Sequence, residues 1–316
     1  MPTRTEPHPS APFDVVVCGS LNLDLQTRLT TLPRPGETVS ASTLARWPGG
    51  KGLNQAIAAA RLGARTAMLG AIGEDADGAI LRAALIAEGV DVTRVLSRRA
   101  TPSGLAQVFV ADDGENSIVV HAGANGTLAP DDVHRHTPPA RVYLAQGEVP
   151  PTSVQVFFER AAATGGLRIL NAAPVVPGIE LLRRAADLLV LNVTELATLA
   201  GCEPEGLQGT SLIDRARSLI ATPTQTVIVT QGDRGVSVIT ASAAEHRAAR
   251  RVQIVDTTGA GDCFCGALAA ALAHGKELMQ ALQWAQAAAS ISVGRNGAAP
   301  SMPTMAELTA VLELDG

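Results

Sequence analysis

The chain has 316 residues, a net charge of −5 at pH 7, 46% hydrophobic residues and only 3% aromatic residues. This length allows one large α/β domain with a sizeable buried core. Nucleic-acid binding relies on basic patches and stacking rings, so the composition argues against a nucleic-acid partner. No apolar run approaches the length of a membrane span, and we expect no membrane segment.

The first twelve residues, MPTRTEPHPSAP, are polar and rich in proline. They lack the apolar stretch of a secretory signal, and we expect residues 1–12 to be a disordered tail before a single domain over 13–316. Cys18, Cys202, Cys263 and Cys265 are expected to be reduced thiols, because Cys263 and Cys265 are too close in sequence for a good disulfide. We therefore expect a cytoplasmic protein.

The first part of the chain alternates between short apolar runs and helical patterns. Residues 13–18 predict a buried strand that ends in a Gly-Ser turn, and polar residues 26–47 predict exposed strands and a turn. Residues 49–64 and 77–90 predict helices on either side of a strand at 66–73. Two β-rich runs around DDGEN predict a hairpin within 103–125.

From residue 141 onward, apolar strands alternate with amphipathic helices, which predicts an α/β fold with a mostly parallel central sheet covered on both faces. Residues 234–242 and 246–256 predict a short antiparallel pair, and 260–275 and 277–297 predict two late helices. The segments at about 25–48 and 104–122 predict a small β appendage. Such a lid can cover a ligand site at the carboxyl ends of the strands.

The stretch DTTGAGD, residues 256–262, places an aspartate directly behind a glycine-rich turn that enters a helix. Backbone N–H groups of Gly259, Ala260 and Gly261 at such a turn bind an anion, helped by the helix dipole. A carboxylate beside an anion site is explained if Asp262 is the catalytic base that takes a proton from a hydroxyl while the N–H groups hold a phosphoryl group. The alternative, that Asp262 is an ordinary N-cap, fits the residue types equally well.

Two common nucleotide-binding motifs are missing. The stretch GGKGLN at 49–54 lacks the spacing of a P-loop, and no convincing G-x-G-x-x-G follows the first strand. A P-loop enzyme and a dinucleotide oxidoreductase are therefore disfavoured.

Six short motifs occur in the order and spacing of the carbohydrate kinases of the ribokinase family: PGETV (35–39), GGKGLNQA (49–56), HAGAN (121–125), NVTE (192–195), TQGDRG (230–235) and DTTGAGD (256–262). The chain resembles this family from about residue 13 to 312. The resemblance implies a three-layer α/β/α domain with a small β-sheet lid. It also implies ATP-dependent phosphorylation of D-ribose at O5, which gives D-ribose 5-phosphate and ADP.

The resemblance also assigns ligand contacts. It places sugar contacts at Asn22, Asp24, Gly50, Lys51, Asn54, Glu148 and Asp262, and nucleotide contacts at Asn192, Thr230, Gly232, Gly261 and Gln286. Without it, Asn22 and Asp24 would be interpreted as turn residues, Lys51 and Asn54 as a solvated helix start and Glu148 as a surface charge. Asn192 and Glu195 would be a helix start with an acid in its first turn.

Metal ions and a partner chain are implied in the same way. Glu195 would orient water on Mg²⁺, which prefers oxygen ligands and keeps several waters. A monovalent cation such as K⁺ would be enclosed by backbone carbonyls of Thr258, Arg295 and Gly297 and by side-chain oxygens of Asp256 and Ser301. The exposed edges of the lid favour a homodimer, because such edges are rarely left bare.

The acceptor stays open. A deoxyribose, fructose or other hexose, or nucleoside acceptor would need the same Asp262 chemistry and differ in a few hydroxyl contacts. A sugar-binding regulator without catalysis is the alternative from another functional class, and the intact GAGD stretch argues against it.

Overall fold

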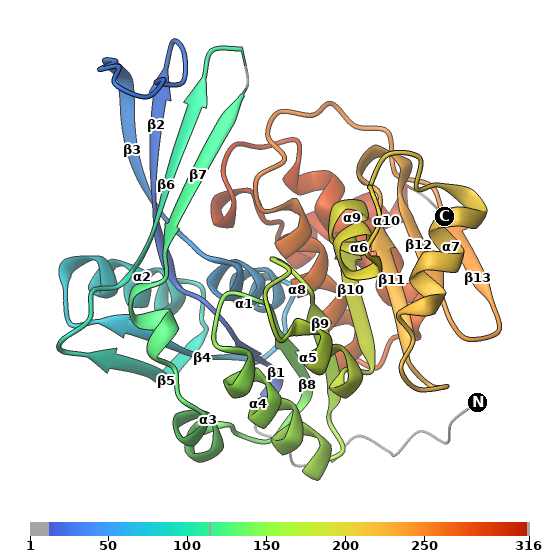
Figure 1. Cartoon of the computed structure of the whole chain (residues 1–316). Coiled ribbons are helices and arrows are strands. Elements are labelled where there is room, and N and C mark those ends of the chain that lie inside the picture. The colour runs from blue at the N-terminus through green and yellow to red at the C-terminus, as the bar shows by residue number, and fades with distance from the viewer. Residues whose placement is uncertain (1–12, 114, 315–316) are drawn as a thin grey trace.

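The computed structural model describes residues 13–113 and 115–314, so the expected disordered tail at 1–12 lies outside the described residues. The described residues form a nine-stranded sheet with helices on both faces and a separate four-stranded sheet at one end (Figure 1). This arrangement confirms the predicted fold class. Within this part of the chain, no helix has both the length and the apolar character needed to cross a bilayer.

The large sheet has the order β13-β12-β11-β10-β9-β8-β1-β4-β5. Its strands from β11 to β5 pair in parallel, and β12 and β13 add an antiparallel edge. The strands are β1 (Phe13–Cys18), β4 (Thr66–Gly73), β5 (Asp91–Arg98), β8 (Ala140–Ala145), β9 (Leu167–Asn171), β10 (Leu188–Asn192), β11 (Thr226–Thr230), β12 (Val236–Ile239) and β13 (Ala244–Arg247).

Both faces of this sheet are buried because its central strands are predominantly apolar. In β1, Val15 and Val17 pack into one core, and Val16 and Cys18 pack into the other. The first core contains α1 (Lys51–Arg61), α2 (Ala76–Ala87), α8 (Ala260–Ala273), α9 (Leu278–Ser292) and α10 (Met305–Glu313). The second contains α3 (Pro130–His136), α4 (Pro151–Ala163), α5 (Ile179–Ala185), α6 (Val193–Ala200) and α7 (Gly209–Ser218).

The strand order reverses direction between β1 and β8. From β1 the chain continues to β4 and β5 on one side, whereas β8, β9, β10 and β11 follow on the other. Open α/β sheets bind ligands at the carboxyl ends of strands beside such a switch point. The residues that follow β1 and β8 are therefore expected near a ligand.

The four-stranded sheet, which we call the lid, has the order β3-β2-β6-β7. It consists of β2 (Asn22–Leu29), β3 (Ala41–Gly49), β6 (Gly104–Ala111) and β7 (Asn116–His121). Two antiparallel pairs are joined by a parallel pairing of β2 with β6. The lid stands above one end of the large sheet (Figure 1). Because β2 directly follows β1, the start of the lid adjoins the switch point.

The antiparallel pair predicted near residues 234–256 is only partly correct. β13 covers residues 244–247, and residues 248–256 have no regular structure. The strand β12 has four residues, and all four pair with β13. A longer β13 would therefore have no residues of β12 left to pair with.

Candidate active site

The glycine-rich turn places Asp262 inside the first turn of α8 and not at its cap. Gly259 is the N-cap, with φ of 74° and no side-chain capping bond, and Asp262 is the third residue of the helix. A side chain at Gly259 would also collide with Ala298, since a Cβ there would lie 2.7 Å from the Ala298 Cβ. The N-cap alternative for Asp262 is therefore wrong.

Asp262 is 7% exposed, and both of its carboxylate oxygens accept hydrogen bonds from α1. Asn54 Nδ2 donates to Oδ2 at 3.0 Å, and Gln55 Nε2 donates to Oδ1 at 2.9 Å. A carboxylate has about four lone-pair sites, so each oxygen keeps capacity for a further proton or donor. Asp262 is thus held in place while remaining able to accept a proton.

The backbone N–H groups of the turn are not equivalent. The Ala260 N–H donates to the Thr257 carbonyl at 3.2 Å. The N–H groups of Gly259 and Gly261 have no such partner among the described residues. Two of the three predicted donors are therefore available to an anion in this conformation.

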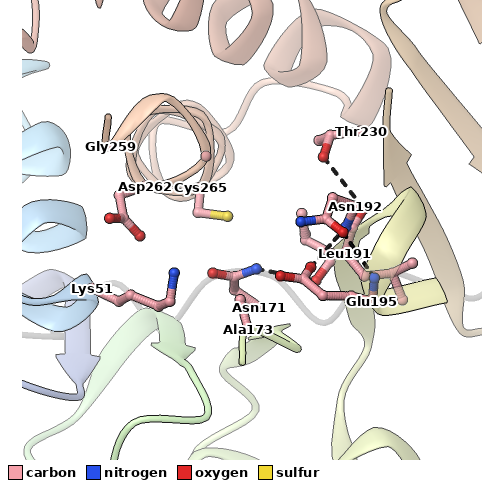
Figure 2. Close-up of a pocket in the computed structure, with 12 residues that line it drawn as sticks. Lys51, Asn171, Ala173, Leu191, Asn192, Glu195, Thr230, Gly259, Asp262 and Cys265 are labelled. Carbon is pink, nitrogen blue, oxygen red and sulfur yellow. Dashed lines mark hydrogen bonds between the residues drawn. The ribbon is translucent and has the colours of Figure 1, made fainter. Parts of the chain in front are cut away.

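A cavity of about 210 Å³ connects Asp262 with the ends of β10 and β11 (Figure 2). Lys51 and Asp262 lie on one side of it, and Asn192, Glu195 and Thr230 lie on the other. The full lining is Lys51, Asn171, Ala173, Val190, Leu191, Asn192, Glu195, Thr230, Gly259, Gly261, Asp262 and Cys265. The structure thus brings together residues expected to contact a sugar and residues expected to contact a nucleotide.

Lys51 is the cation of a carboxylate cluster. The negative charge of Asp262 raises the pKa of Lys51, and Glu148 and Glu195 add to this effect against the opposing effect of burial. Burial raises the pKa of Asp24 to about 7, with further contributions from Glu148 and Asp262. Burial also raises the pKa of Glu195, whereas the Asn192 N–H and Lys51 lower it. Lys51 is placed to neutralise these charges and to donate to a ligand.

Two glycines leave space for residues that are predicted to contact the sugar. A Cβ at Gly49 would lie 2.2 Å from Asp24 Oδ2, and a Cβ at Gly50 would lie 2.8 Å from the Asn22 nitrogen. Gly50 also has φ of 91°, which favours glycine at the N-cap of α1. The glycine pair therefore lets the start of α1 approach the carboxylate on β2.

The remaining predicted sugar contacts are fixed by polar neighbours at the switch point. Glu148 Oε2 accepts hydrogen bonds from the Ser20 hydroxyl and from the Lys51 N–H, the latter at 3.1 Å. Asn22 Oδ1 accepts from Asn125 Nδ2 at 2.8 Å, so its own amide nitrogen stays available. Glu148 thus contacts Lys51, which lines the cavity, and its side chain is not a free surface charge.

Asn192 and Glu195 form a helix start that also lines the cavity. They form a capping box, in which the Asn192 N–H donates to Glu195 Oε2 and the Glu195 N–H donates to Asn192 Oδ1, each at 2.8 Å. They also line the cavity that contains Asp262. The Glu195 carboxylate there is of the kind that suits Mg²⁺, which is held by one or two carboxylates together with substrate phosphates and water.

Asp256 ties the turn before α8 to the loop after α9. Its Oδ1 accepts from the N–H and hydroxyl of Thr258, at 2.9 and 2.6 Å, and its Oδ2 accepts from the Gly297 N–H at 2.9 Å. Burial opposes ionisation of Asp256, but these hydrogen bonds lower its pKa overall. The two segments predicted to enclose a monovalent cation are therefore adjacent.

Two other members of that predicted set have their side chains engaged elsewhere. The Arg295 guanidinium pairs with Glu307 at 2.6 Å, and the buried Ser301 hydroxyl lies 2.7 Å from that of Ser292. Arg295 and Gly297 were expected to contribute backbone carbonyls, which these contacts leave unaffected. Among the described residues, no group of three His, Cys, Asp or Glu side chains is arranged to hold a metal ion.

Gln286 lies outside the cavity around Asp262. Its amide donates to the carbonyl of Ala248 at 3.1 Å, and it lines a second hollow with Arg247, Ala248, Arg250 and Gln283. Gly232 begins a short 3-10 turn after β11, beside Thr230. The structure therefore groups Asn192, Thr230 and Gly261 in one cavity and places Gln286 apart.

Several polar residues near Asp262 are not among those that the sequence predicts for the site. Gln55, Gln146 and Asn171 form a buried amide cluster beside Asp262, and Asn125 and Ser20 hold the turn after β1. A signal existed for Gln146 and Asn171, since each is a polar residue at the end of an apolar strand.

Comparisons with known proteins agree with this geometry. The family model described as "pfkB family carbohydrate kinase" matches residues 13–305. The chain belongs to this carbohydrate kinase family. A ribokinase of Haemophilus influenzae is 35% identical over 302 residues, which cover 95% of this chain and 98% of that protein. A deoxyribokinase of Salmonella typhi is 33% identical over 309 residues, 96% of this chain and 100% of the relative.

A solved structure of a carbohydrate kinase extends the similarity to three dimensions. The ribokinase of Arabidopsis thaliana, complexed with ribose and ATP, matches with a TM-score of 0.86 and 32% identity. The match covers 95% of this chain and 98% of the plant chain. The similarity therefore includes both the large sheet and the lid.

Proposed function

We propose that this chain is an ATP-dependent ribokinase that transfers the γ-phosphoryl group of ATP to O5 of D-ribose. The observation that carries the proposal is the cavity shared by Asp262, Lys51, Asn192 and Glu195. On one side of this cavity lies the buried carboxylate of Asp262 at the start of α8, and on the other side lie the residues expected to contact the nucleotide. The full-length similarity to ribokinases supports the choice of acceptor.

Asp262 is the base in this proposal. Its carboxylate takes the proton of the 5-hydroxyl while the hydroxyl oxygen forms a bond to the γ-phosphorus. The bond from that phosphorus to the bridging oxygen of ADP breaks, and ADP leaves with the bonding electron pair. N–H groups of Gly259 and Gly261 stabilise the charge on the transferring group, with Ala260 joining if its turn bond opens.

The ions have separate roles. Glu195 and Asn192 would hold Mg²⁺ through water, and Mg²⁺ would neutralise charge on the phosphates. The segments 256–258 and 294–301 would enclose K⁺ with carbonyls of Thr258, Arg295 and Gly297 and with side-chain oxygens of Asp256 and Ser301. Because Asp256 already joins the two segments, a cation there would fix the turn that carries Gly259.

Sugar recognition is assigned to the cluster at the switch point. Asp24 and Glu148 would accept hydrogen bonds from sugar hydroxyls, and Lys51, Asn22 and Asn54 would donate or accept around the ring. Gly50 allows the backbone to approach the sugar. Thr230, Gly232 and Gln286 would contact the nucleotide.

We also propose that the lid pairs with the lid of a second copy. Leu44, Trp47, Ile118, Val119 and Val120 are all at least half exposed on its strands. Apolar side chains on exposed strands favour association with a complementary surface. The use of ATP and the four free cysteines support a cytoplasmic location.

A panel of acceptors tests the function. ADP release is measured with D-ribose, 2-deoxyribose, fructose and adenosine, each with Mg²⁺ and with either K⁺ or Na⁺. We expect a preference for D-ribose that K⁺ increases. Preference for 2-deoxyribose is the second candidate, favoured by the deoxyribokinase match, and would keep Asp262 as base while changing the acceptor. No ADP release with any sugar would contradict the proposed function.

A further inference from the structure

The amide of Gln55 is fully used in hydrogen bonds inside the protein. Gln55 is 0% exposed, and its Nε2 donates to Asp262 Oδ1 at 2.9 Å and to Asn171 Oδ1 at 3.0 Å. Its oxygen accepts from Gln146 Nε2 at 2.6 Å. A glutamine amide has two hydrogens to donate, so neither is left for a ligand.

The two acceptors of the Gln55 amide, Asn171 and Asp262, determine which groups of the cluster donate and which accept. Asn171 Nδ2 donates to the Val190 carbonyl, which can only accept, so Asn171 presents its oxygen to Gln55. Asp262 as a carboxylate also only accepts, so both acceptors require the nitrogen of Gln55 on their side. The Gln55 oxygen then faces Gln146, so Gln146 must donate a hydrogen bond to it from its own amide nitrogen.

Four elements meet in this cluster. Gln55 belongs to α1 and Asp262 to α8, while Gln146 and Asn171 lie at the ends of β8 and β9. Gln146 is also 0% exposed, and a Cβ at Gly19 would lie 2.0 Å from its Oε1. Gln146 therefore fills space that only a glycine at the end of β1 leaves open.

Neither glutamine lines the cavity that contains Asp262. Both side chains are completely buried, which keeps them from contact with sugar or nucleotide. Together they form a chain of hydrogen bonds that ends at Oδ1 of Asp262. Buried polar networks of this kind favour one arrangement, because an unpaired amide or carboxylate in the interior is costly. Among the described residues, the Oε1 of Gln146 is the one polar atom of the two glutamine amides without a hydrogen-bond partner.

We propose that Gln55 and Gln146 are positioning residues for the transfer step. Gln146 fixes the amide of Gln55 so that a donor, and never an acceptor, meets Oδ1 of Asp262. This contact holds the carboxylate aimed at the sugar hydroxyl. The inference rests on the proposed role of Asp262 as base. We call this chain of hydrogen bonds from Gln146 through Gln55 to Asp262 the relay. Its loss lowers kcat and leaves the KM for sugar nearly unchanged.

The substitution Gln146→Glu tests the relay without altering the residue beside Asp262. The new carboxyl can donate to the Gln55 oxygen only while it carries a proton, and burial keeps it protonated to higher pH than in water. Once ionised, it repels that oxygen or turns the Gln55 amide around. We therefore expect kcat to fall as pH rises from 6 to 8.5, by about 10- to 100-fold at the upper end, where the unmodified enzyme shows no such fall.

Gln55→Glu is the second variant, with the same expected loss of kcat at high pH. Other titratable groups near Asp262 are Asp24, Lys51, Glu148, Glu195, Cys263 and Cys265, and both variants leave all of them in place. The matched control is Gln225→Glu, because Gln225 is a buried glutamine whose Nε2 donates to the carbonyls of Arg183 and Ala186. We expect it to lower the melting temperature without changing the shape of the kcat profile.

The outcomes are distinguishable. Profiles of kcat against pH that fall in both variants but not in Gln225→Glu support the relay. A profile parallel to that of the unmodified enzyme in either folded variant overturns it. Asp262→Asn is measured in parallel. If that variant keeps normal turnover, the proposed base is wrong, whereas an inactive Asp262→Asn with parallel Gln→Glu profiles refutes the relay alone.

Discussion

The amide nitrogen of Asn54 lies 3.0 Å from Oδ2 of Asp262 and joins residues 208 positions apart in the chain. It connects α1, which follows the lid strand β3, to α8, the helix that begins at the glycine turn. The start of α1 is therefore the element through which the sugar side of the site is aligned with the proposed base.

The substitution Gly261→Ala should lower activity without lowering the stability of the fold. A Cβ at Gly261 meets no atom within 4 Å, and the residue is within α8, where alanine is favoured over glycine by up to about 1 kcal/mol. The added methyl group enters the cavity where the phosphoryl group is expected. We predict an equal or higher melting temperature together with at least about 10-fold lower kcat/KM for ATP.

The control for that variant is Gly126→Ala, whose Cβ would meet only the Ala122 Cβ at 3.6 Å, an ordinary contact. It should leave kcat/KM unchanged. Unchanged activity in Gly261→Ala would show that the transferring group does not approach this turn.

How much of this site the sequence predicts depends on whether a residue belongs to a continuous motif. Gly50, Lys51 and Asn54 lie in one stretch, and DTTGAGD is another, so the family resemblance identifies both together. Gln55 is in the same stretch but is buried and does not line the cavity, so its role appears only when Asp262 and Asn171 are placed beside it. Such pairings depend on tertiary packing.

The fold follows the same rule. Apolar strands such as β1 and β4 are predicted by composition, because both of their faces are buried. The strand β5 contains polar residues at an exposed edge of the sheet, and its pattern predicts no element. The short helix α3 and the final helix α10 were not predicted either. The parallel pairing of β2 with β6 joins segments about 80 residues apart and has no local signal.

Sugar affinity should depend on the protonation of Asp24. Its pKa is raised to about 7, so its carboxylate, the stronger acceptor for hydroxyl groups, is lost as pH falls through 7. We predict that the Kd for D-ribose rises about 10-fold or more between pH 8 and pH 5.5. Asp24→Asn should bind weakly with little dependence on pH, as measured by calorimetry. A Kd independent of pH in the unmodified protein would contradict this role.

The same group affects stability. Because the folded pKa of Asp24 is above its unfolded value, the folded state without ligand retains a proton that the unfolded chain has lost between about pH 4 and pH 7. Stability therefore falls as pH rises through this window. Asp24→Asn should have a higher melting temperature than the unmodified chain at pH 8, and the difference should diminish toward pH 4. An equal difference at both pH values would exclude the linkage.

Arg61 supports the proposed cation loop from the far end of α1. Its guanidinium donates to the carbonyls of Ala299 and Met302, at 3.0 and 2.6 Å, and pairs with Glu88. Arg61→Lys keeps the charge but loses the planar fork that reaches these partners. We predict a lower melting temperature and a higher concentration of K⁺ for half-maximal activation of ADP release.

Arg82→Lys is the matched control, because Arg82 donates to the carbonyls of Val92 and Val95 away from the loop. It should lower the melting temperature without affecting activation by K⁺. Equal K⁺ responses in the two variants would argue against a cation site at residues 294–301.

The most direct test is the turnover of Asp262→Asn with D-ribose, ATP, Mg²⁺ and K⁺, measured together with its affinity for D-ribose. The control is Asp187→Asn, which removes a carboxylate that binds Arg168 away from the site. We predict that kcat for ADP release falls about 10³-fold in Asp262→Asn, while the Kd for D-ribose stays within a few fold and the control turns over normally. A kcat within 10-fold of the unmodified enzyme would contradict the assignment of Asp262 as the base.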